Sequence, residues 1–263
     1  MQERIIAVDW SGAIEHPQRT IWLAEFVNGF PEDLTNGLTR QDVVEYLKKK
    51  RRTSSTLVVG LDFAFSCPAW FLRQQQCASA TDFWSLVKLQ GEEWLRLCPH
   101  PFWGKCGRKR PVSGTLLFRK TEEQARVLGF APKSVFQLAG PGHVGTGSVR
   151  GMPFLIDLLE AGFSIWPFHD ATAHTVIEIY PRVLTKRVFK RNARDRADFL
   201  AEARFTSLPK EWRLKAEQSE DAFDAAVSAY ALSSHSRGLM SLKRTMDSDI
   251  LLEGAIWDPT RSN

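Results

Sequence analysis

The sequence predicts an α/β protein built as one domain over residues 1–263. Apolar runs typical of buried strands alternate with segments of helical periodicity. Two of these runs place an aspartate near their end. The chain has 263 residues, 43% of them hydrophobic, which is enough to bury a substantial core. No internal repeat or linker divides it.

Composition excludes several classes of protein. Phe, Trp, Leu and Val are too abundant for a disordered chain. No apolar run approaches the roughly 20 residues that cross a bilayer, and the first residues lack the apolar core of a signal peptide. Four cysteines form no CxxC pair, so we expect reduced thiols, a cytoplasmic protein and no membrane partner. The net charge of +5 is compatible with an anionic partner without requiring one.

The first part of the chain predicts two strands joined by a tight turn. Residues 4–10 form a mostly apolar run with Asp9 near its end, as expected for a strand buried on both faces. Residues 20–27 form a second strand. The Asn28-Gly29 pair that follows is the strongest short signal for a β-hairpin.

A helix and another strand are expected next. Thr39 is a candidate N-cap, with Asp42 at the third helical position, for a helix that runs through residue 52. Residues 56–63 then read as a buried strand, again with an acid, Asp62, near its end. The first sixty or so residues therefore predict the order strand, hairpin, helix, strand.

The middle of the chain is less regular. We expect Thr81 to cap a helix that carries several aromatic residues, and the stretch 99–114, rich in Pro, Gly and basic residues, to be a loop. A short helix is expected after Thr121. The glycine-rich segment 140–151 then opens a helix that stops at Gly162.

The last part predicts two strands followed by helices. The strands are expected at residues 164–168 and 175–180, with Pro181 ending the second. Ser219 is a candidate N-cap for a helix over residues 220–232.

Acids near the ends of predicted strands are the first candidates for chemistry. Functional residues of α/β sheets gather at the carboxyl ends of strands, where Asp9, Asp62 and Glu178 are expected. A buried carboxylate is costly unless it meets a cation, a set of hydrogen-bond donors or a metal. The simpler explanation for any one of them is a loop cap or an ion pair with a local arginine, but three in one sheet favour a site.

The helix after Ser219 carries two further acids. Asp221 and Asp224 are three residues apart and share a helix face, while alanines around them allow close approach to a sheet. Acids in a first helical turn also favour the helix dipole, which is a purely structural explanation. Hard cations such as Mg²⁺, however, need clustered oxygens of this kind.

Five motifs together carry a resemblance to a known family. They are AVDWSG (7–12), GLDFAFS (60–66), GPGHVGTGSVRGMP (140–153), EIYPR (178–182) and EDAFDAAVSA (220–229). In this order the chain resembles the domain-of-unknown-function 429 family, described as predicted nucleases of the ribonuclease H-like superfamily. Its last helix resembles that of Holliday-junction resolvases.

The resemblance implies a fold and a set of roles. The fold would be a ribonuclease H-like mixed sheet flanked by helices, with an inserted helical and loop region at about residues 67–140. Asp9, Asp62, Asp221 and Asp224 match the metal-binding acids, and Glu178 is a further candidate catalytic acid. The implied activity is two-metal hydrolysis of phosphodiester bonds in DNA or RNA, with two Mg²⁺ or Mn²⁺ ions and nucleic acid as partner.

A glycine-rich loop and its surroundings are candidates for phosphate or substrate binding. Backbone N–H groups at a helix N-terminus attract phosphate, and the candidates are Ser11, Gly145, Gly147, Ser148 and Arg150. The loop is not a Walker A motif, since no Gly-Lys-Ser or Gly-Lys-Thr follows. Its glycines are also explained by a long turn that needs unusual backbone angles.

Three alternatives remain open at this point. An actin-like or sugar-kinase-type phosphotransferase has a similar acid-plus-glycine turn, here Asp9 to Gly12, but such proteins contain the fold twice. A non-catalytic nucleic-acid-binding protein of the same fold is the second. Separately, Cys98, His100 and Cys106 offer metal ligands, although their spacing fits no standard zinc finger.

Overall fold

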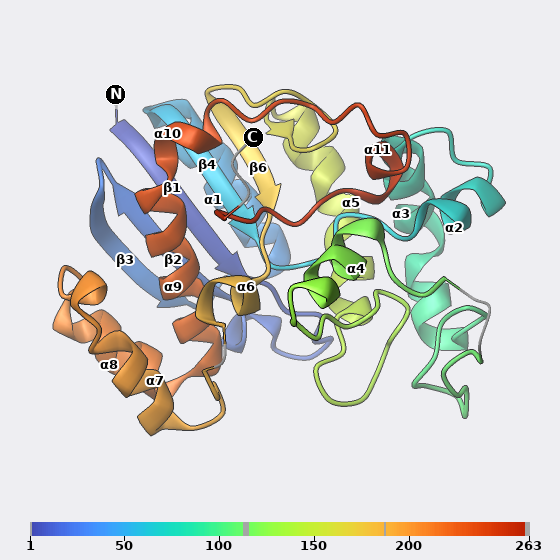
Figure 1. Cartoon of the computed structure of the whole chain (residues 1–263). Helices are drawn as coiled ribbons and strands as arrows, with labels where there is room; N and C mark the ends of the chain where they lie inside the picture. The colour runs from blue at the N-terminus through green and yellow to red at the C-terminus, as the bar shows by residue number, and fades with distance from the viewer. Residues whose placement is uncertain (1, 113–115, 187, 261–263) are drawn as a thin grey trace.

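A computed structural model describes residues 2–112, 116–186 and 188–260 and confirms the α/β class. Its centre is a six-stranded mixed sheet in the order β3-β2-β1-β4-β6-β5 (Figure 1). The strands are β1 (Gln2–Asp9), β2 (Trp22–Val27), β3 (Phe30–Asn36), β4 (Ser54–Leu61), β5 (Ser164–Ile165) and β6 (His174–Glu178). Residues 113, 114 and 115, within the predicted loop and insertion, lie outside the described part.

Helices cover the sheet, and several lie in the region between β4 and β5. They are α1 (Arg40–Thr53), α2 (Ala69–Gln74), α3 (Ala80–Leu97), α4 (Lys120–Val127), α5 (Gly145–Glu160), α6 (Pro181–Thr185), α7 (Ala193–Leu200), α8 (Lys210–Gln218), α9 (Glu220–Ser234), α10 (Ser236–Leu239) and α11 (Ile250–Glu253). Two 3₁₀ turns occur at Pro17–Arg19 and Ala203–Phe205.

The strand pairing brings the predicted acids to one edge. β1, β2 and β3 form an antiparallel meander, whereas β4 runs parallel to β1 and β6 parallel to β4. Val8 pairs with Leu61, and Leu61 pairs with Glu178. The carboxyl ends of β1, β4 and β6 therefore meet, which is where parallel strands gather functional residues.

Local sequence explains the meander and the first helix. Asn28 and Gly29 both have positive φ angles, 50° and 83°, as a two-residue hairpin turn requires, so the predicted hairpin is confirmed. The predicted N-cap Thr39 is confirmed too, and it forms a capping box: the Thr39 side chain accepts from the Asp42 amide, and Asp42 accepts from the Thr39 amide.

Two hydrophobic cores lie on opposite faces of the sheet. Side chains alternate along β1, so Ile6 and Val8 enter the core under α1, α3 and α5, while Ile5 and Ala7 enter the core under α8 and α9. Figure 1 shows α9 in front of the strands and α5 behind them. Burial on both faces explains why the predicted strands are nearly continuous apolar runs.

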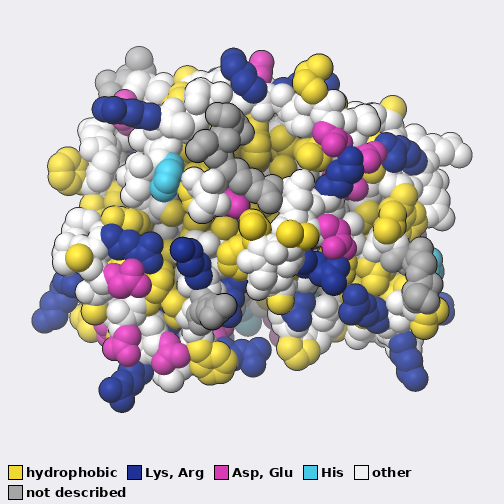
Figure 2. Space-filling model, viewed as in Figure 1, with side chains coloured by type: hydrophobic (Ala, Val, Ile, Leu, Met, Phe, Trp, Pro, Cys, Tyr) yellow, Lys and Arg dark blue, Asp and Glu magenta, His cyan; other side chains and the backbone are white. Residues whose placement is uncertain are grey.

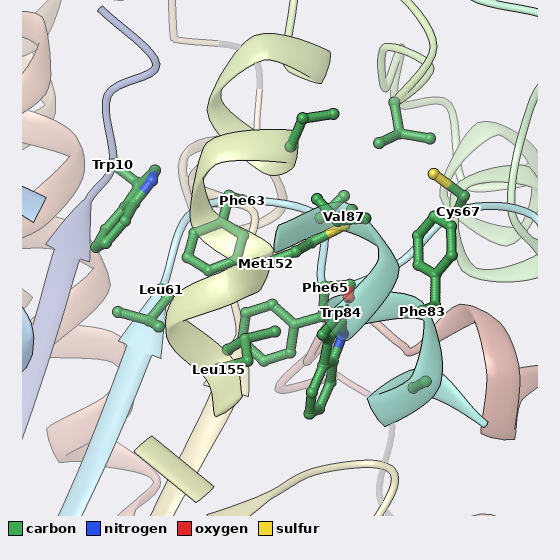
Figure 3. Close-up of a cluster of buried hydrophobic side chains, with 14 of the residues drawn as sticks. Trp10, Leu61, Phe63, Phe65, Cys67, Phe83, Trp84, Val87, Met152 and Leu155 are labelled. Atoms are coloured by element: carbon green, nitrogen blue, oxygen red, sulfur yellow. Dashed lines mark hydrogen bonds between the residues drawn. The ribbon is translucent and has the colours of Figure 1, made fainter. Parts of the chain in front are cut away.

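The larger core fixes α5 against the carboxyl end of β4. Figure 3 shows Phe63 beside α5 and Trp84 of α3 directed at Phe65, whose carbonyl accepts a 2.7 Å hydrogen bond from the Trp84 indole. A Cβ atom at Gly151 would come within 2.8 Å of the Phe63 ring. The glycine therefore allows the helix to lie against the aromatic side chain.

Several boundaries differ from the predictions. α3 is capped by Ser79, which accepts from the Asp82 amide, so Thr81 lies within the helix. α4 begins at Lys120, one residue before Thr121. β5 ends at Ile165, not at residue 168, because Pro167 lacks the N–H that would continue the ladder.

The largest difference is the start of α5. The helix begins at Gly145, so most of the glycine-rich segment is helical and not a loop that ends at residue 151. A Cβ atom at Gly145 would lie 2.2 Å from the Val135 carbonyl oxygen. Close packing, and not backbone freedom, is therefore what requires glycine there. Ser219 caps α9, as predicted.

None of the helices within the described ranges is long and apolar enough to cross a membrane.

Candidate functional site

Three aspartates from distant parts of the chain meet at the carboxyl edge of the sheet. Asp9 ends β1, Asp62 directly follows β4, and Asp224 lies in the second turn of α9. One ligand atom of each lies within 4.8 Å of those of the other two. The structure therefore brings together three of the four acids that the sequence predicts as metal ligands.

Small residues on α9 make this approach possible. Ala222, Ala225 and Ala226 are fully buried against the sheet. Side chains without γ atoms let the helix axis come close to β1 and β2, and this places the carboxylate of Asp224 next to those of the strands. The alanine pattern is thus as important to the site as the acids themselves.

Asp9 and Asp62 line a cleft of about 560 Å³, and the buried Asp224 carboxylate lies next to them. On one side the cleft is lined by the ends of the strands and by α9. On the other side it is lined by residues of the region between β4 and α5, among them Arg119, Glu122 and Lys133. The predicted insertion therefore forms a wall of the same cleft that holds the acids.

Burial and mutual repulsion weaken the acidity of these groups. Burial, followed by the charges of Asp62 and Asp224, raises the pKa of Asp9 well above its usual value. Burial, followed by the charge of Asp224, raises the pKa of Asp62 to about 8, and burial raises the pKa of Asp224. In the metal-free chain some of these carboxyls therefore hold protons at neutral pH.

Asp221, the fourth predicted ligand, lies at the margin of the cleft. It lines the cavity and is partly exposed, and burial together with Asp224 raises its pKa to about 6. It does not belong to the group of three whose ligand atoms meet. Its place is therefore beside the cluster.

A lysine that the sequence analysis did not select completes the cluster. Lys190, between α6 and α7, forms an ion pair with Oδ2 of Asp224. Burial works against its charge, but the neighbouring Asp224 carboxylate outweighs this effect and the pKa of Lys190 is raised. No sequence pattern marks this residue, because it stands among other basic residues in an irregular segment.

The second carboxylate oxygen of Asp224, Oδ1, indicates whether the residues of the cluster suit a metal ion. Asp224 is 8% exposed, and its Oδ1 is buried without a hydrogen-bond partner among the described residues. Such an oxygen is costly unless a cation or donor reaches it. A hard divalent cation prefers carboxylate oxygens, so the donor set formed by Asp9, Asp62 and Asp224 fits Mg²⁺ or Mn²⁺.

Glu178, predicted as a further catalytic acid, also lines the cleft, but its carboxylate is fully engaged. Arg119 donates to both of its oxygens, at 2.8 and 2.5 Å, and the Phe65 amide donates to Oε2 at 2.9 Å. The side chain is 2% exposed. Its geometry is that of a buried ion pair, and a direct part in catalysis stays a prediction.

The phosphate-binding candidates divide into two groups. Ser11 and Gly147 line the cleft. Gly145 packs against the Val135 carbonyl and does not line the cleft. Ser148 is fully buried, and its hydroxyl accepts a hydrogen bond from the Ala64 amide.

Arg150 has a bracing role in the structure. Its guanidinium pairs with Glu92 at 2.7 and 2.8 Å and also donates to the Gly12 carbonyl. It thereby connects α5 with α3 and with the turn after β1. Of the five predicted phosphate contacts, the geometry supports only those of Ser11 and Gly147.

The cysteine and histidine candidates do not converge. Over the described ranges the aspartate triad is the only group of three or more potential metal ligands. Cys98 is buried in the core, whereas Cys106 is exposed, with its thiol against the Arg96 carbonyl. No zinc site formed by Cys98, His100 and Cys106 is present.

The face of the molecule drawn in Figure 2 carries both positive and negative side chains. Figure 2 shows Lys and Arg side chains spread over this face and interspersed with Asp and Glu. They do not gather into one large basic patch of the kind that binds nucleic acid by charge alone. A nucleic-acid partner therefore stays a prediction.

Comparison with known proteins adds no relative. No family model, no curated protein and no solved structure matches this chain. The resemblance to the domain-of-unknown-function 429 family thus stays a prediction, and functional inference rests on the geometry of the cleft.

Proposed function

We propose that this protein is a metal-dependent nuclease of the ribonuclease H-like superfamily, related to the domain-of-unknown-function 429 family. One observation carries the proposal: Asp9, Asp62 and Asp224 converge from two parallel strands and a late helix at the edge of a cleft. Carboxylates so grouped bind Mg²⁺ or Mn²⁺, and phosphodiester hydrolysis is chemistry that such ions catalyse.

The sheet supports the fold assignment. An antiparallel meander of β1, β2 and β3 is extended by the parallel strands β4 and β6, with helices on both faces. This is the mixed sheet that the resemblance implies. The position of the acids at the ends of β1 and β4 agrees with the same assignment.

The residues of the cleft have separate tasks in this proposal. Asp9, Asp62 and Asp224 would hold the metal, and a bound Mg²⁺ or Mn²⁺ would supply the activation of water and the charge stabilisation that phosphodiester hydrolysis needs. Ser11 and Gly147 line the space where a phosphate would lie. Arg119 neutralises Glu178 and so limits the negative charge that a phosphodiester would meet.

The phosphotransferase alternative has less support. Proteins of the actin-like and sugar-kinase type contain two copies of the fold. Within the described residues the strands form one six-stranded sheet. The non-catalytic alternative differs from the nuclease only in activity, so it is an outcome of the following test.

Cleavage of defined substrates tests the proposal. The purified protein is incubated with single-stranded, duplex and branched DNA and RNA, in Mg²⁺, in Mn²⁺ and in EDTA. We expect cleavage that requires a metal and falls at least about a hundredfold in Asp62→Asn.

Asp33→Asn is the matched control, because Asp33 lies on β3, exposed and outside the cleft lining, and this change should leave cleavage intact. If no substrate is cut under any metal condition, the protein is not a nuclease. Metal-dependent binding without cleavage would support the non-catalytic alternative.

A further inference from the structure

We propose that Lys190 is a built-in second cation of this site, so that the cleft binds one divalent ion and not two. The inference rests on the proposed function and specifies its metal requirement. In a two-metal nuclease each ion stabilises charge on the reacting phosphate. Here the ammonium group of Lys190 takes the place of one of them.

The two oxygens of the Asp224 carboxylate have different environments. Oδ2 is engaged by Lys190, whereas Oδ1 is buried and has no partner within the described part of the chain. One carboxylate thus offers one oxygen to the lysine and one to a metal. Because Lys190 holds Oδ2, only Oδ1 of Asp224 would be available to a divalent ion.

The position of Lys190 is fixed by its surroundings. Its backbone carbonyl accepts a hydrogen bond from Arg196, a 4% exposed residue of α7. Arg196 also donates to the carbonyls of Ala216 and Glu217 near the end of α8. The Lys190 side chain is only 21% exposed. It is therefore anchored to two helices and is not a freely moving surface lysine.

The charges balance with one metal. Asp9, Asp62 and Asp224 carry three negative charges when ionised, and Lys190 carries one positive charge. The remaining two negative charges are those that a single divalent ion neutralises. A second ion in the same group would leave an excess of positive charge in a mostly buried cluster, which is unfavourable.

The neighbouring carboxylates are not placed to bind a second ion. Asp221 and Glu220, whose Oε1 is also buried without a partner among the described residues, both lie outside the group whose ligand atoms meet. Both oxygens of Glu178 accept hydrogen bonds from Arg119. Neighbouring acids therefore do not complete a second site while Lys190 holds Asp224. An ammonium group, a compact point charge with three donors, is suited to contact a phosphate oxygen in its place.

Counting bound Mn²⁺ tests this inference directly. Equilibrium dialysis of the full chain, with Mn²⁺ measured by electron paramagnetic resonance, should give one ion per wild-type chain. Lys190→Met removes the ammonium and frees Oδ2, so two ions per chain are expected. Lys190→Gln repeats the test with a polar side chain in case the first variant does not fold.

Two controls accompany the measurement. Lys133→Met removes the same charge from the opposite wall of the cleft, and it should still bind one ion. Asp62→Asn removes a ligand, and Mn²⁺ affinity should fall at least tenfold. Melting curves establish that each variant is folded. A merely structural role for Lys190 would change stability without adding a bound ion.

The outcomes separate this inference from the proposed function. Two ions in the wild type together with metal-dependent cleavage would overturn the inference and leave the nuclease proposal standing. One ion in both folded Lys190 variants would also overturn it. No bound ion and no cleavage in the wild type would overturn both.

Discussion

Burial and a neighbouring negative charge act in the same direction on the Asp62 carboxyl group. Burial and the neighbouring Asp224 raise its pKa to about 8, compared with about 3.9 in an unfolded chain. Between these values the folded state binds a proton that the unfolded state has lost. Stability without metal therefore falls as the pH rises through this range, and it is greatest on the acidic side.

We expect Asp62→Asn to remove part of this dependence. In EDTA at pH 8.5 the variant should melt several degrees above the wild type, since each kcal/mol is worth roughly 2–4 °C in a chain of this size. Near pH 5.5 the difference should shrink, because the wild-type carboxyl is then protonated. Thermal melting at several pH values measures both effects.

Mg²⁺ provides the internal control. It should raise the melting temperature of the wild type at pH 8.5 and have much less effect on Asp62→Asn. A variant that melts below the wild type in EDTA at pH 8.5 would show that the Asp62 carboxylate is instead needed for folding.

At the scale of residues, the strand-end acids could be predicted and their partners could not. Asp9 and Asp62 follow buried apolar runs, and the position of Asp224 follows from helical spacing. Lys190 reaches Asp224 across 34 residues from an irregular segment. Arg119 and Glu178 are 59 residues apart. Such pairings depend on tertiary structure, which no local pattern encodes.

At the scale of elements, α5 shows how packing overrides propensity. Glycine is among the poorest helix formers, and this favours a loop over residues 140–151. The structure begins the helix at Gly145 because that residue and Gly151 lie against other groups too closely for a side chain. β1, α1, β4 and α9, by contrast, were predictable because their apolar periodicity, turn residues and caps agree with their tertiary environment.

Gly145→Ala should therefore destabilise the protein. The added Cβ would lie 2.2 Å from the Val135 carbonyl oxygen, a backbone atom that a rotamer change cannot move. Overpacking of this kind costs about 1–3 kcal/mol, and urea unfolding should show a loss of at least that size.

Gly238→Ala is the matched control. Gly238 lies in α10, and a Cβ atom added there would have no neighbouring atom within 4 Å among the described residues. Stability should stay the same or rise by about 0.5–1 kcal/mol. Equal losses in the two variants would contradict the role given to close packing at the start of α5.

At the scale of the whole molecule, Arg119 joins segments that are far apart in sequence. This 1% exposed residue is the N-cap of α4, binds Glu122 and Glu178, and donates to the Glu253 carbonyl of α11 at 2.9 Å. It connects the region between β4 and α5 with the edge of the sheet and with the last helix. The wall of the cleft depends on this one guanidinium.

Arg119→Met should lower the free energy of unfolding by about 3–5 kcal/mol, because two carboxylates lose their buried cation. The loss should shrink as the pH falls from 7 toward 5. Burial raises the pKa of Glu122 and Arg119 opposes this effect, so without the arginine the folded pKa of Glu122 rises further and its protonation favours the folded state. Chemical denaturation at both pH values measures the change.

A double variant and a surface control complete this experiment. Adding Glu178→Gln to Arg119→Met removes one of the stranded charges and should recover part of the stability. Arg126→Met, which breaks the exposed pair with Glu123, should change stability by no more than about 0.5 kcal/mol. A loss in Arg126→Met as large as in Arg119→Met would contradict the special role of the buried network.

The separation of Asp9, Asp62 and Asp224 along the chain has a consequence for synthesis on the ribosome. The first two ligands emerge early, and the strands that carry them pair in parallel. Asp224 leaves the exit tunnel more than 150 residues after Asp62. Ile256, which also lines the cleft, leaves it later still. Chains emerge at roughly 5–20 residues per second, so about ten seconds or more separate these events. A nascent chain that stops before α9 cannot bring the three aspartates together, so the proposed metal site forms only after α9 has been made.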